Sequence, residues 1–420
     1  MTRRTLFLAV PTVLAFATAA FAPTASAAPS LVGVAHRNVP VCSAPVSGAA
    51  ACDAIRHDRL TAAGRVIPNA TPAGYGPADL QSAYNLPSAT SATSATWKTA
   101  GVGQVVAIVD AYNDPSALSD VNTYRSQFGI ASLLTCTSAS PALSTKPCFS
   151  KVNQSGGTKY PRSNGGWAQE ISLDLDMVSA ACPNCSILLV EATSSTFTNL
   201  GAAVNQAAQL GATEISNSYG GGESSSDASY DATYFNHPKV AITVSSGDSG
   251  YGVQYPAASE YVTAVGGTTL ARPTGSTPGW SETVWSRAGS GCSAYDPQPS
   301  WQSHVANITG VCAKRAVADV SAVADPNTGV AVYDSYTYQG VGGWLVFGGT
   351  SVSSPLIASV YALAGNATKT SYGSYPYSHT SALNDVTIGS NGSCGNVLCN
   401  ATLGWDGPTG LGTPNGTGAF

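Results

Sequence analysis

Two carboxylates four residues apart are the first candidates for chemistry in this sequence. Glu170 and Asp174 lie in "WAQEISLDLDM", a stretch predicted to be helical, so their side chains share one face of the helix. Met177 and Val178 continue that face and indicate that it is partly buried. Asp176 points about 200° around the helix from Asp174 and does not belong to the pair. Like charges at this spacing favour sharing a proton, which raises the pKa of one carboxyl group.

A carboxyl group with a raised pKa can act as a general base in moderately acidic water, where a histidine would be protonated. The alternative is two acids on a solvated helix face. For the motif taken alone, the two interpretations have equal weight.

Asp248, in "VSSGDSGYG", is a candidate for stabilising a developing oxyanion. An ionised aspartate would repel that charge, whereas a protonated one could donate a hydrogen bond. Protonation requires acid or a pocket that raises the pKa. The alternative is an ordinary turn aspartate among glycines.

Ser351, in "FGGTSVSSP", is the candidate nucleophile, because Gly-Thr-Ser followed by small residues and Pro is similar to the nucleophile segment of subtilisin-type proteases. Subtilisins use a histidine base, and no histidine of this chain has a matching context. We interpret all five as surface or turn residues: His36, His57, His237, His304 and His379.

Strands and helices are predicted to alternate along the chain. Strands are expected at 104–112, 186–192, 212–220, 240–250 and 261–270, and helices at 167–181, 197–211, 227–237 and 350–365. The segment 384–416 is rich in Gly and Asn and is expected to form loops. This order predicts an α/β fold with a mostly parallel central sheet, helices on both faces, and active groups at the carboxyl ends of strands.

Three segments are predicted along the chain. Residues 1–27 have the basic start, apolar run and small-residue end of a secretory signal, and a membrane anchor is the weaker alternative because Pro11 interrupts the run. Residues 28–74 are expected to be a short pro-segment or N-terminal extension with a short helix at 52–64. Residues 75–420 are the main domain, with a "SATSATSAT" connector near its start.

The composition of the chain limits which binding partners and which cellular compartment are expected. The net charge is −5 and there is no basic run, which argues against nucleic acid as a partner. Ten cysteines in an exported chain suggest disulfides. They form local couples: Cys42 with Cys52, Cys136 with Cys148, Cys182 with Cys185, Cys292 with Cys312, and Cys394 with Cys399. Spacing alone does not fix this connectivity.

The ordered set of motifs resembles the sedolisins, the serine-carboxyl peptidases with a subtilisin-related fold. The matching stretches run from about Tyr75 to the C-terminus and include "VVAIVDAYNDP", "EISLD", "SNSYGGGE", "SSGDSG", "GGTSVSSPL" and "GWDGPTGLGTP". The resemblance implies that Ser351 is the nucleophile and Glu170 its general base. It also implies that Asp174 supports Glu170 through a shared proton, that Asp248 is the oxyanion donor, and that Asp110 has a supporting role.

The resemblance further implies one structural calcium ion in the C-terminal loops. Its ligands would be the carboxylates of Asp385 and Asp406 and the carbonyls of Val386, Thr402 and Gly404. The chain departs from the family in its short N-terminal segment, in Ile171 after the glutamate, where relatives often have an aromatic residue, and in Tyr219, where relatives often have Trp.

These observations together predict a secreted, acid-active serine endopeptidase that acts on polypeptides, is a monomer and has no membrane segment in its mature form. Two other classes remain open. One is a secreted, non-catalytic binding protein on the same scaffold. The other is a glycosidase that uses the carboxylate pair, although two residues on adjacent turns of one helix would not straddle a sugar naturally.

Overall fold

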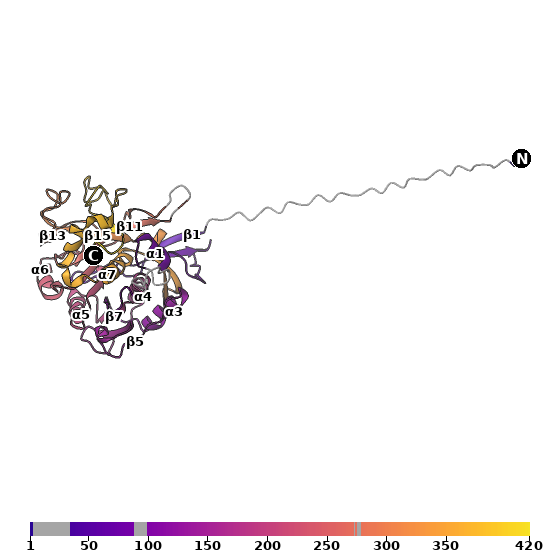
Figure 1. The fold of residues 1–420 in the computed structure, drawn as a ribbon, viewed down its shortest axis with the longest axis horizontal. Helices are drawn as coiled ribbons and strands as arrows, with labels where there is room; N and C mark the ends of the chain where they lie inside the picture. The colour runs from indigo at the N-terminus through magenta and orange to yellow at the C-terminus, as the bar shows by residue number, and fades with distance from the viewer. Residues whose placement is uncertain (3–33, 88–98, 273, 275–278) are drawn as a thin grey trace. The chain divides into compact units, whose positions relative to one another are not determined.

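Continuous apolar runs of the sequence form a central sheet in the computed structural model, which describes residues 1–2, 34–87, 99–272, 274 and 279–420. The strand order is β12-β11-β10-β8-β4-β7-β6-β5, and β15 also pairs with β11. Figure 1 labels β5, β7, β11 and β15 of this sheet. The strands are β4 (Val105–Ala111), β5 (Leu134–Thr135), β6 (Cys148–Asn153), β7 (Ser186–Ala192), β8 (Glu214–Asn217), β10 (Ala241–Ser245), β11 (Thr263–Ala271), β12 (Ser281–Val284) and β15 (Val320–Val323). Of these strands, β12 is the antiparallel one, so the predicted mostly parallel sheet is confirmed.

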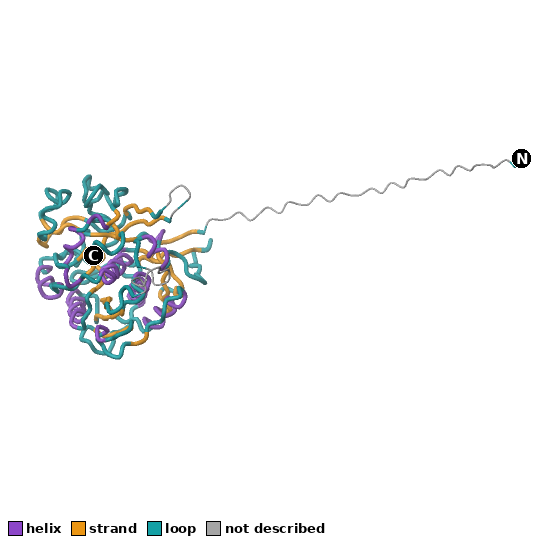
Figure 2. Tube along the Cα trace, in the orientation of Figure 1, coloured by secondary structure: helices purple, strands orange, loops and turns teal. Residues whose placement is uncertain are grey.

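Helices cover both faces of this sheet, because its strands are apolar on both sides. Ile108 of β4 packs in one cluster with residues of α3, α4 and α7, whereas the next residue, Val109, packs in another cluster with residues of α5. The helices are α3 (Ala117–Gln127), α4 (Gly165–Ala181), α5 (Phe197–Gln209) and α7 (Thr350–Ala364), shown in purple in Figure 2. The predicted two-sided α/β arrangement is therefore confirmed.

The remaining elements are short or lie in smaller sheets. They are α1 (Pro77–Ala83), α6 (Asp227–Tyr230), a π-helical turn (Asp231–Phe235), β13 (Gly291–Pro297), β14 (Lys314–Val317), β18 (Leu383–Asn384), β19 (Thr413–Pro414) and short 3₁₀ turns at Pro141–Leu143, Pro326–Thr328, Ala367–Lys369, Tyr372–Ser378 and Thr380–Ala382. The helix predicted at 227–237 is thus split into α6 and the π-helical turn. The segment 384–416 is mostly loop, as predicted.

The N-terminal segment is built into the fold by strands. β1 (Ala35–Pro40), β3 (Ile55–Leu60), β17 (Val341–Gly348) and β16 (Val330–Tyr338) form an antiparallel sheet in the order β1-β3-β17-β16. The helix predicted at 52–64 is therefore wrong. Pairing on both sides of β3 overrides its local helical tendency, and the buried Arg56 donates hydrogen bonds to Asp58 and Gln169.

Residues Ala35–Phe420 form one compact unit. Except for Met1 and Thr2, the predicted signal peptide at 1–27 lies outside the described residues, as does the connector at 88–96. The boundary between the segments 28–74 and 75–420 stays a prediction.

All five cysteine couples suggested by spacing are disulfides in the structure. Among the helices that the structure describes, none has both the length and the apolar character needed to cross a bilayer.

Candidate active site

Ser351 lies in the first turn of α7, directly after the strand β17. The turn between the two elements is made by Gly349, whose φ is +99°. A Cβ atom at this position would lie 1.8 Å from the carbonyl oxygen of Asp53 and 2.6 Å from Asp248 Oδ2. Only glycine therefore allows the chain to present Ser351 at this point.

The hydroxyl of Ser351 donates a hydrogen bond to Glu170 Oε2 over 2.9 Å. Helices α4 and α7 pack against each other and bring together these two residues, which are 181 positions apart. Burial, followed by the charges of Asp174 and Asp110, raises the pKa of Glu170 well above its usual value. The predicted nucleophile and base are thus in contact.

Asp174 lies one turn after Glu170 on the buried α4, and its Oδ1 accepts a hydrogen bond of 2.9 Å from the hydroxyl of Ser218. Glu170 Oε1 and Asp174 Oδ2 accept no hydrogen bond from a donor among the described residues. Burial, followed by the charge of Asp110, raises the pKa of Asp174 well above its usual value. Asp176 lies apart from this pair, as predicted, and accepts a hydrogen bond from the amide of Tyr333.

Asp110 is the second-last residue of the fully buried strand β4 and adds a third carboxyl to the group. It is fully buried, and neither of its oxygens has a hydrogen-bond partner among the described residues. Burial and the charge of Glu191 raise its pKa well above the usual value, and its own charge raises the pKa values of Glu170 and Asp174. Asp110 therefore belongs to the same electrostatic group.

Asp248 follows β10 and faces the start of α7. Its Oδ1 accepts two hydrogen bonds of 2.8 Å, one from the amide and one from the hydroxyl of Thr350. Its Oδ2 has no partner among the described residues. Burial raises the pKa of Asp248 to about 7, although the hydrogen bonds from Thr350 act in the opposite direction. A protonated Oδ2 would be free to donate, as an oxyanion donor must.

Three residues that complete this arrangement were not identified from the sequence: Ser218, Thr350 and Asp53. Ser218 lies within the motif "SNSYGGGE", and Thr350 precedes the nucleophile, so both could have been found from their position in quoted motifs. Asp53 lies in the segment expected to be a pro-segment, and no local pattern singles it out.

Comparisons with known proteins agree with this geometry. Residues 153–392, more than half of the chain, match the subtilase family. The chain belongs to the subtilase family. The matched range contains Glu170, Asp174, Asp248 and Ser351, and the predicted subtilisin-like fold is confirmed.

Similar relatives of this subtilase include sedolisin and kumamolisin, so the predicted resemblance to sedolisins is confirmed. Sedolisin of Pseudomonas sp. (strain 101) is 29% identical over 84% of this chain and 61% of its own length. Kumamolisin of Bacillus sp. (strain MN-32) is 30% identical over 83% of this chain and 63% of its own length. Tripeptidyl-peptidase sed1 of Aspergillus fumigatus is 29% identical over 42% of this chain and 34% of its own length.

The solved structure of Pseudomonas sedolisin, a serine-carboxyl proteinase complexed with pseudo-iodotyrostatin, is also similar to this subtilase. The TM-score is 0.63 at 28% identity, covering 82% of this chain and 96% of that one. The chain spans less than two thirds of the length of the first two relatives, sedolisin and kumamolisin.

The N-terminal segment of this subtilase runs directly over the candidate catalytic residues. Strand β2 (Ala51–Cys52) pairs antiparallel with β9 (Tyr219–Gly220), and the amide of Asp53 donates to the carbonyl of Ser218. The side chain of Asp53 accepts a 2.7 Å hydrogen bond from Ser245. Its charge contributes to the raised pKa of Glu170, and its own pKa is raised well above the usual value by burial and then by Asp248. With this segment in place, both Ser351 and Glu170 are fully buried.

The two halves of the predicted calcium site lie next to each other. Asp385 Oδ2 accepts a 2.8 Å hydrogen bond from the amide of Gly404, and Asp406 Oδ2 accepts one of 3.2 Å from the amide of Thr402. Val386 is buried beside Asp385. The donor set contains only hard oxygen atoms, which fits Ca²⁺.

Proposed function

We propose that this protein is a secreted, acid-active serine endopeptidase that hydrolyses polypeptides through an acyl-enzyme on Ser351. The observation that carries the proposal is the 2.9 Å hydrogen bond from the Ser351 hydroxyl to a fully buried glutamate. A serine hydroxyl becomes a useful nucleophile when an adjacent base can take its proton. In this site a carboxylate occupies the place of that base.

In the proposed reaction, Ser351 Oγ attacks the scissile carbonyl while Glu170 Oε2 accepts the hydroxyl proton. Glu170 then gives a proton to the leaving amine, and the same relay with water releases the acyl group. Asp174 shares a proton with the other oxygen of Glu170 and so limits the repulsion between the two carboxyls. Asp110 raises both pKa values and keeps this proton within the group.

Asp248 sets the upper pH limit of the proposed activity. Because burial raises its pKa to about 7, the carboxyl group is protonated in acid and can donate from Oδ2 to the oxyanion. As the pH rises through 7 it ionises and would repel the developing negative charge. The same pocket therefore supports acyl transfer in acid and opposes it in alkali.

A peptide substrate would bind to β9 as an added antiparallel strand. In the structure, β2 of the N-terminal segment already occupies this position, since it pairs antiparallel with Tyr219 and Gly220. Adding a strand to an exposed edge is a common mode of peptide recognition. Cleavage within polypeptides, rather than release of N-terminal tripeptides, would be shown by hydrolysis of peptides with a blocked N-terminus.

The described chain corresponds, in this proposal, to the latent form of the enzyme. The N-terminal segment occupies the strand position of a substrate, and the disulfide between Cys42 and Cys52 closes it into a loop. A cavity of about 230 Å³ remains between this loop and Trp167, so the loop does not fill the space beside the site. Activity would require cleavage or displacement of the segment.

This latency can be tested by following activity and N-terminal sequence together after a shift to acid. We expect a lag in hydrolysis that ends as residues up to about Asp53 are removed, and no such processing in Ser351→Ala. Full activity without a lag, in a chain that retains this segment, would contradict the latent form.

We also propose one structural calcium ion in the C-terminal loops, held by the carboxylates of Asp385 and Asp406 with carbonyls of Val386, Thr402 and Gly404. The ion would hold these loops together and would take no part in the reaction. Calcium removal should therefore lower the temperature of unfolding, and Asp385→Asn should reduce that effect.

The central experiment is digestion of a denatured protein across acid and neutral pH by the processed enzyme, Ser351→Ala and Glu170→Gln, with the N-terminal segment of the two variants removed beforehand by a separate protease that is then taken out. Loss of hydrolysis in both variants is expected. Equal hydrolysis by all three proteins would overturn the proposal. Polysaccharide hydrolysis that survives Ser351→Ala would favour a carboxylate-pair glycosidase, and absence of any acylation in the processed wild type would favour a binding protein.

A further inference from the structure

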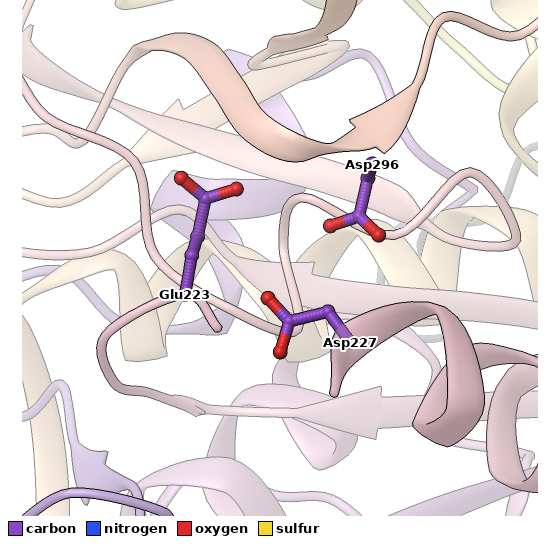
Figure 3. Close-up of side chains that lie close together, drawn as sticks. All are labelled: Glu223, Asp227 and Asp296. Carbon is purple, nitrogen blue, oxygen red and sulfur yellow. The ribbon is translucent and has the colours of Figure 1, made fainter. Parts of the chain in front are cut away.

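A second group of carboxylates lies outside the active site. Glu223 follows β9, Asp227 begins α6, and Asp296 lies in β13. One carboxylate oxygen of each lies within 4.8 Å of the others. Figure 3 shows the three side chains reaching toward a common space from three separate segments.

Asp296 is the least compensated member of this group. It is fully buried, and neither of its oxygens accepts a hydrogen bond from a described donor. Its contact with the carboxyl group of Asp231 offers only a shared proton, and burial followed by the charges of Asp231, Asp227 and Glu223 raises its pKa to about 8. A buried carboxylate without a compensating partner is costly.

The other two carboxylates are held in place without being neutralised. Glu223 accepts hydrogen bonds from the hydroxyl of Ser293 and from the amide of Ala294, the latter over 3.2 and 3.3 Å. Asp227 accepts two bonds of 2.8 Å from the amide and hydroxyl of Ser224. None of the ion pairs found in the described part of the chain includes any of the three acids.

We propose that Glu223, Asp227 and Asp296 bind one divalent cation, of the oxygen-preferring kind represented by Ca²⁺. Ca²⁺–oxygen distances are about 2.3–2.6 Å, so two ligands on opposite sides of the ion are at most about 5 Å apart. The spacing of the three carboxylates satisfies this limit. Three carboxylates supply the negative charge, and water molecules would complete the coordination shell.

The position of the site gives the ion a structural effect near the substrate. Glu223 lies three residues after Gly220 of β9, the strand that pairs with the N-terminal segment over Ser351. Asp296 belongs to β13, which is tied to the following segment by the disulfide between Cys292 and Cys312. A bound ion would therefore fix the loop after β9 to β13 and hold one wall of the substrate site.

Counting bound calcium tests this proposal separately from the C-terminal calcium site. The full chain, stripped with chelator and dialysed against limiting Ca²⁺ at neutral pH, is compared with Asp296→Asn, Glu223→Gln and Asp385→Asn. We expect Asp296→Asn and Glu223→Gln each to lose one equivalent of Ca²⁺ or to bind it at least tenfold more weakly, while Asp385→Asn retains this equivalent. Circular dichroism establishes that each variant is folded.

A crystal of the wild-type protein soaked in Mn²⁺ gives a second, independent measurement. An anomalous peak within coordination distance of the three carboxylates is expected. Unchanged calcium stoichiometry in both Asp296→Asn and Glu223→Gln, together with no anomalous peak at this position, would overturn the proposal. In that case the group holds a shared proton, and Asp296→Asn should stabilise the protein equally with and without Ca²⁺.

Discussion

The candidate active centre and the Glu223 cluster are both groups of buried or half-buried acids without an ion-pair partner in the described part of the chain, and they differ in the elements that carry them. In both groups, serine or threonine hydroxyls donate to particular carboxylate oxygens. Each group also contains one buried acid without a hydroxyl or amide donor among the described residues, Asp110 in the active centre and Asp296 in the cluster.

The supporting elements distinguish the two groups. The acids of the active centre lie on the long, buried helix α4 and at the ends of central strands. Those of the cluster lie on a loop, a four-residue helix and a strand of a two-stranded sheet. We infer that the long, buried elements hold the carboxyls of the active centre in place to share a proton, whereas the carboxyls of the cluster are suited to a cation.

The largest expected effect is a loss of hydrolysis in variants of the active centre that leaves calcium binding unchanged. Ser351→Ala and Glu170→Gln should each lower kcat/KM of the processed enzyme by at least about 10⁴-fold, because they remove the nucleophile or its base. Neither change should alter calcium stoichiometry. Steady-state hydrolysis of a peptide and metal analysis of the same preparations check this, and a loss of calcium in Ser351→Ala would show that the regions are coupled.

Replacing the oxyanion donor should have a smaller effect. Asp248→Asn should reduce kcat by about 10²–10³-fold, the usual result of impairing one such donor. Because an amide does not ionise, the residual activity should persist above pH 7, where the wild type loses activity. If the residual activity still falls as the pH rises through 7, a group other than Asp248 sets the upper pH limit of hydrolysis.

Asp110 is expected to act through its neighbours. Asp110→Asn should lower kcat about tenfold, equivalent to about 1.4 kcal/mol, with little change in KM. Without the charge of Asp110, the pKa of Glu170 should fall, so the lower limb of the pH–rate profile should move to lower pH. An unchanged profile would limit Asp110 to a structural role.

An effect on stability rather than on activity is expected for a buried acid that belongs to neither region. Burial raises the pKa of Glu214 to about 8, and its Oε1 has no partner among the described residues. Because its pKa is raised, the folded state binds more protons than the unfolded state, and stability falls as the pH rises from about 4 to 8. The loss should be about 1.4 kcal/mol for each pH unit in this range.

Glu214→Gln should remove that contribution, which denaturant unfolding at pH 4 and pH 8 can measure. The variant should gain stability relative to wild type at pH 8 and differ little at pH 4. An unchanged dependence on pH would show that burial alone does not perturb this group.

The part of the site carried by local geometry was predictable from the sequence. Glu170 and Asp174 share a helix face because of their four-residue spacing, and Ser351 begins a helix after a glycine turn that its motif predicts. The sheet followed from apolar runs such as that of β4. These features depend on neighbours in sequence, so a single sequence contains them.

The features that escaped prediction depend on distant pairing. Residues 52–64 were predicted to include a helix because one partner of β3, the strand β17, lies almost 300 positions later. The contact between Asp53 and Ser245 spans 192 positions, and the one between Glu223 and Ser293 spans 70. No local periodicity reveals which acids such pairings bring together.

The pH–rate profile of the processed wild-type enzyme tests the central claim most directly. Initial rates of hydrolysis of one blocked peptide should be measured from about pH 3 to pH 9 under conditions in which the protein stays folded. We predict activity in acid that is lost as the pH rises through about 7, where Asp248 ionises. Full activity maintained at pH 8 and above would contradict a carboxyl base paired with a protonated oxyanion donor.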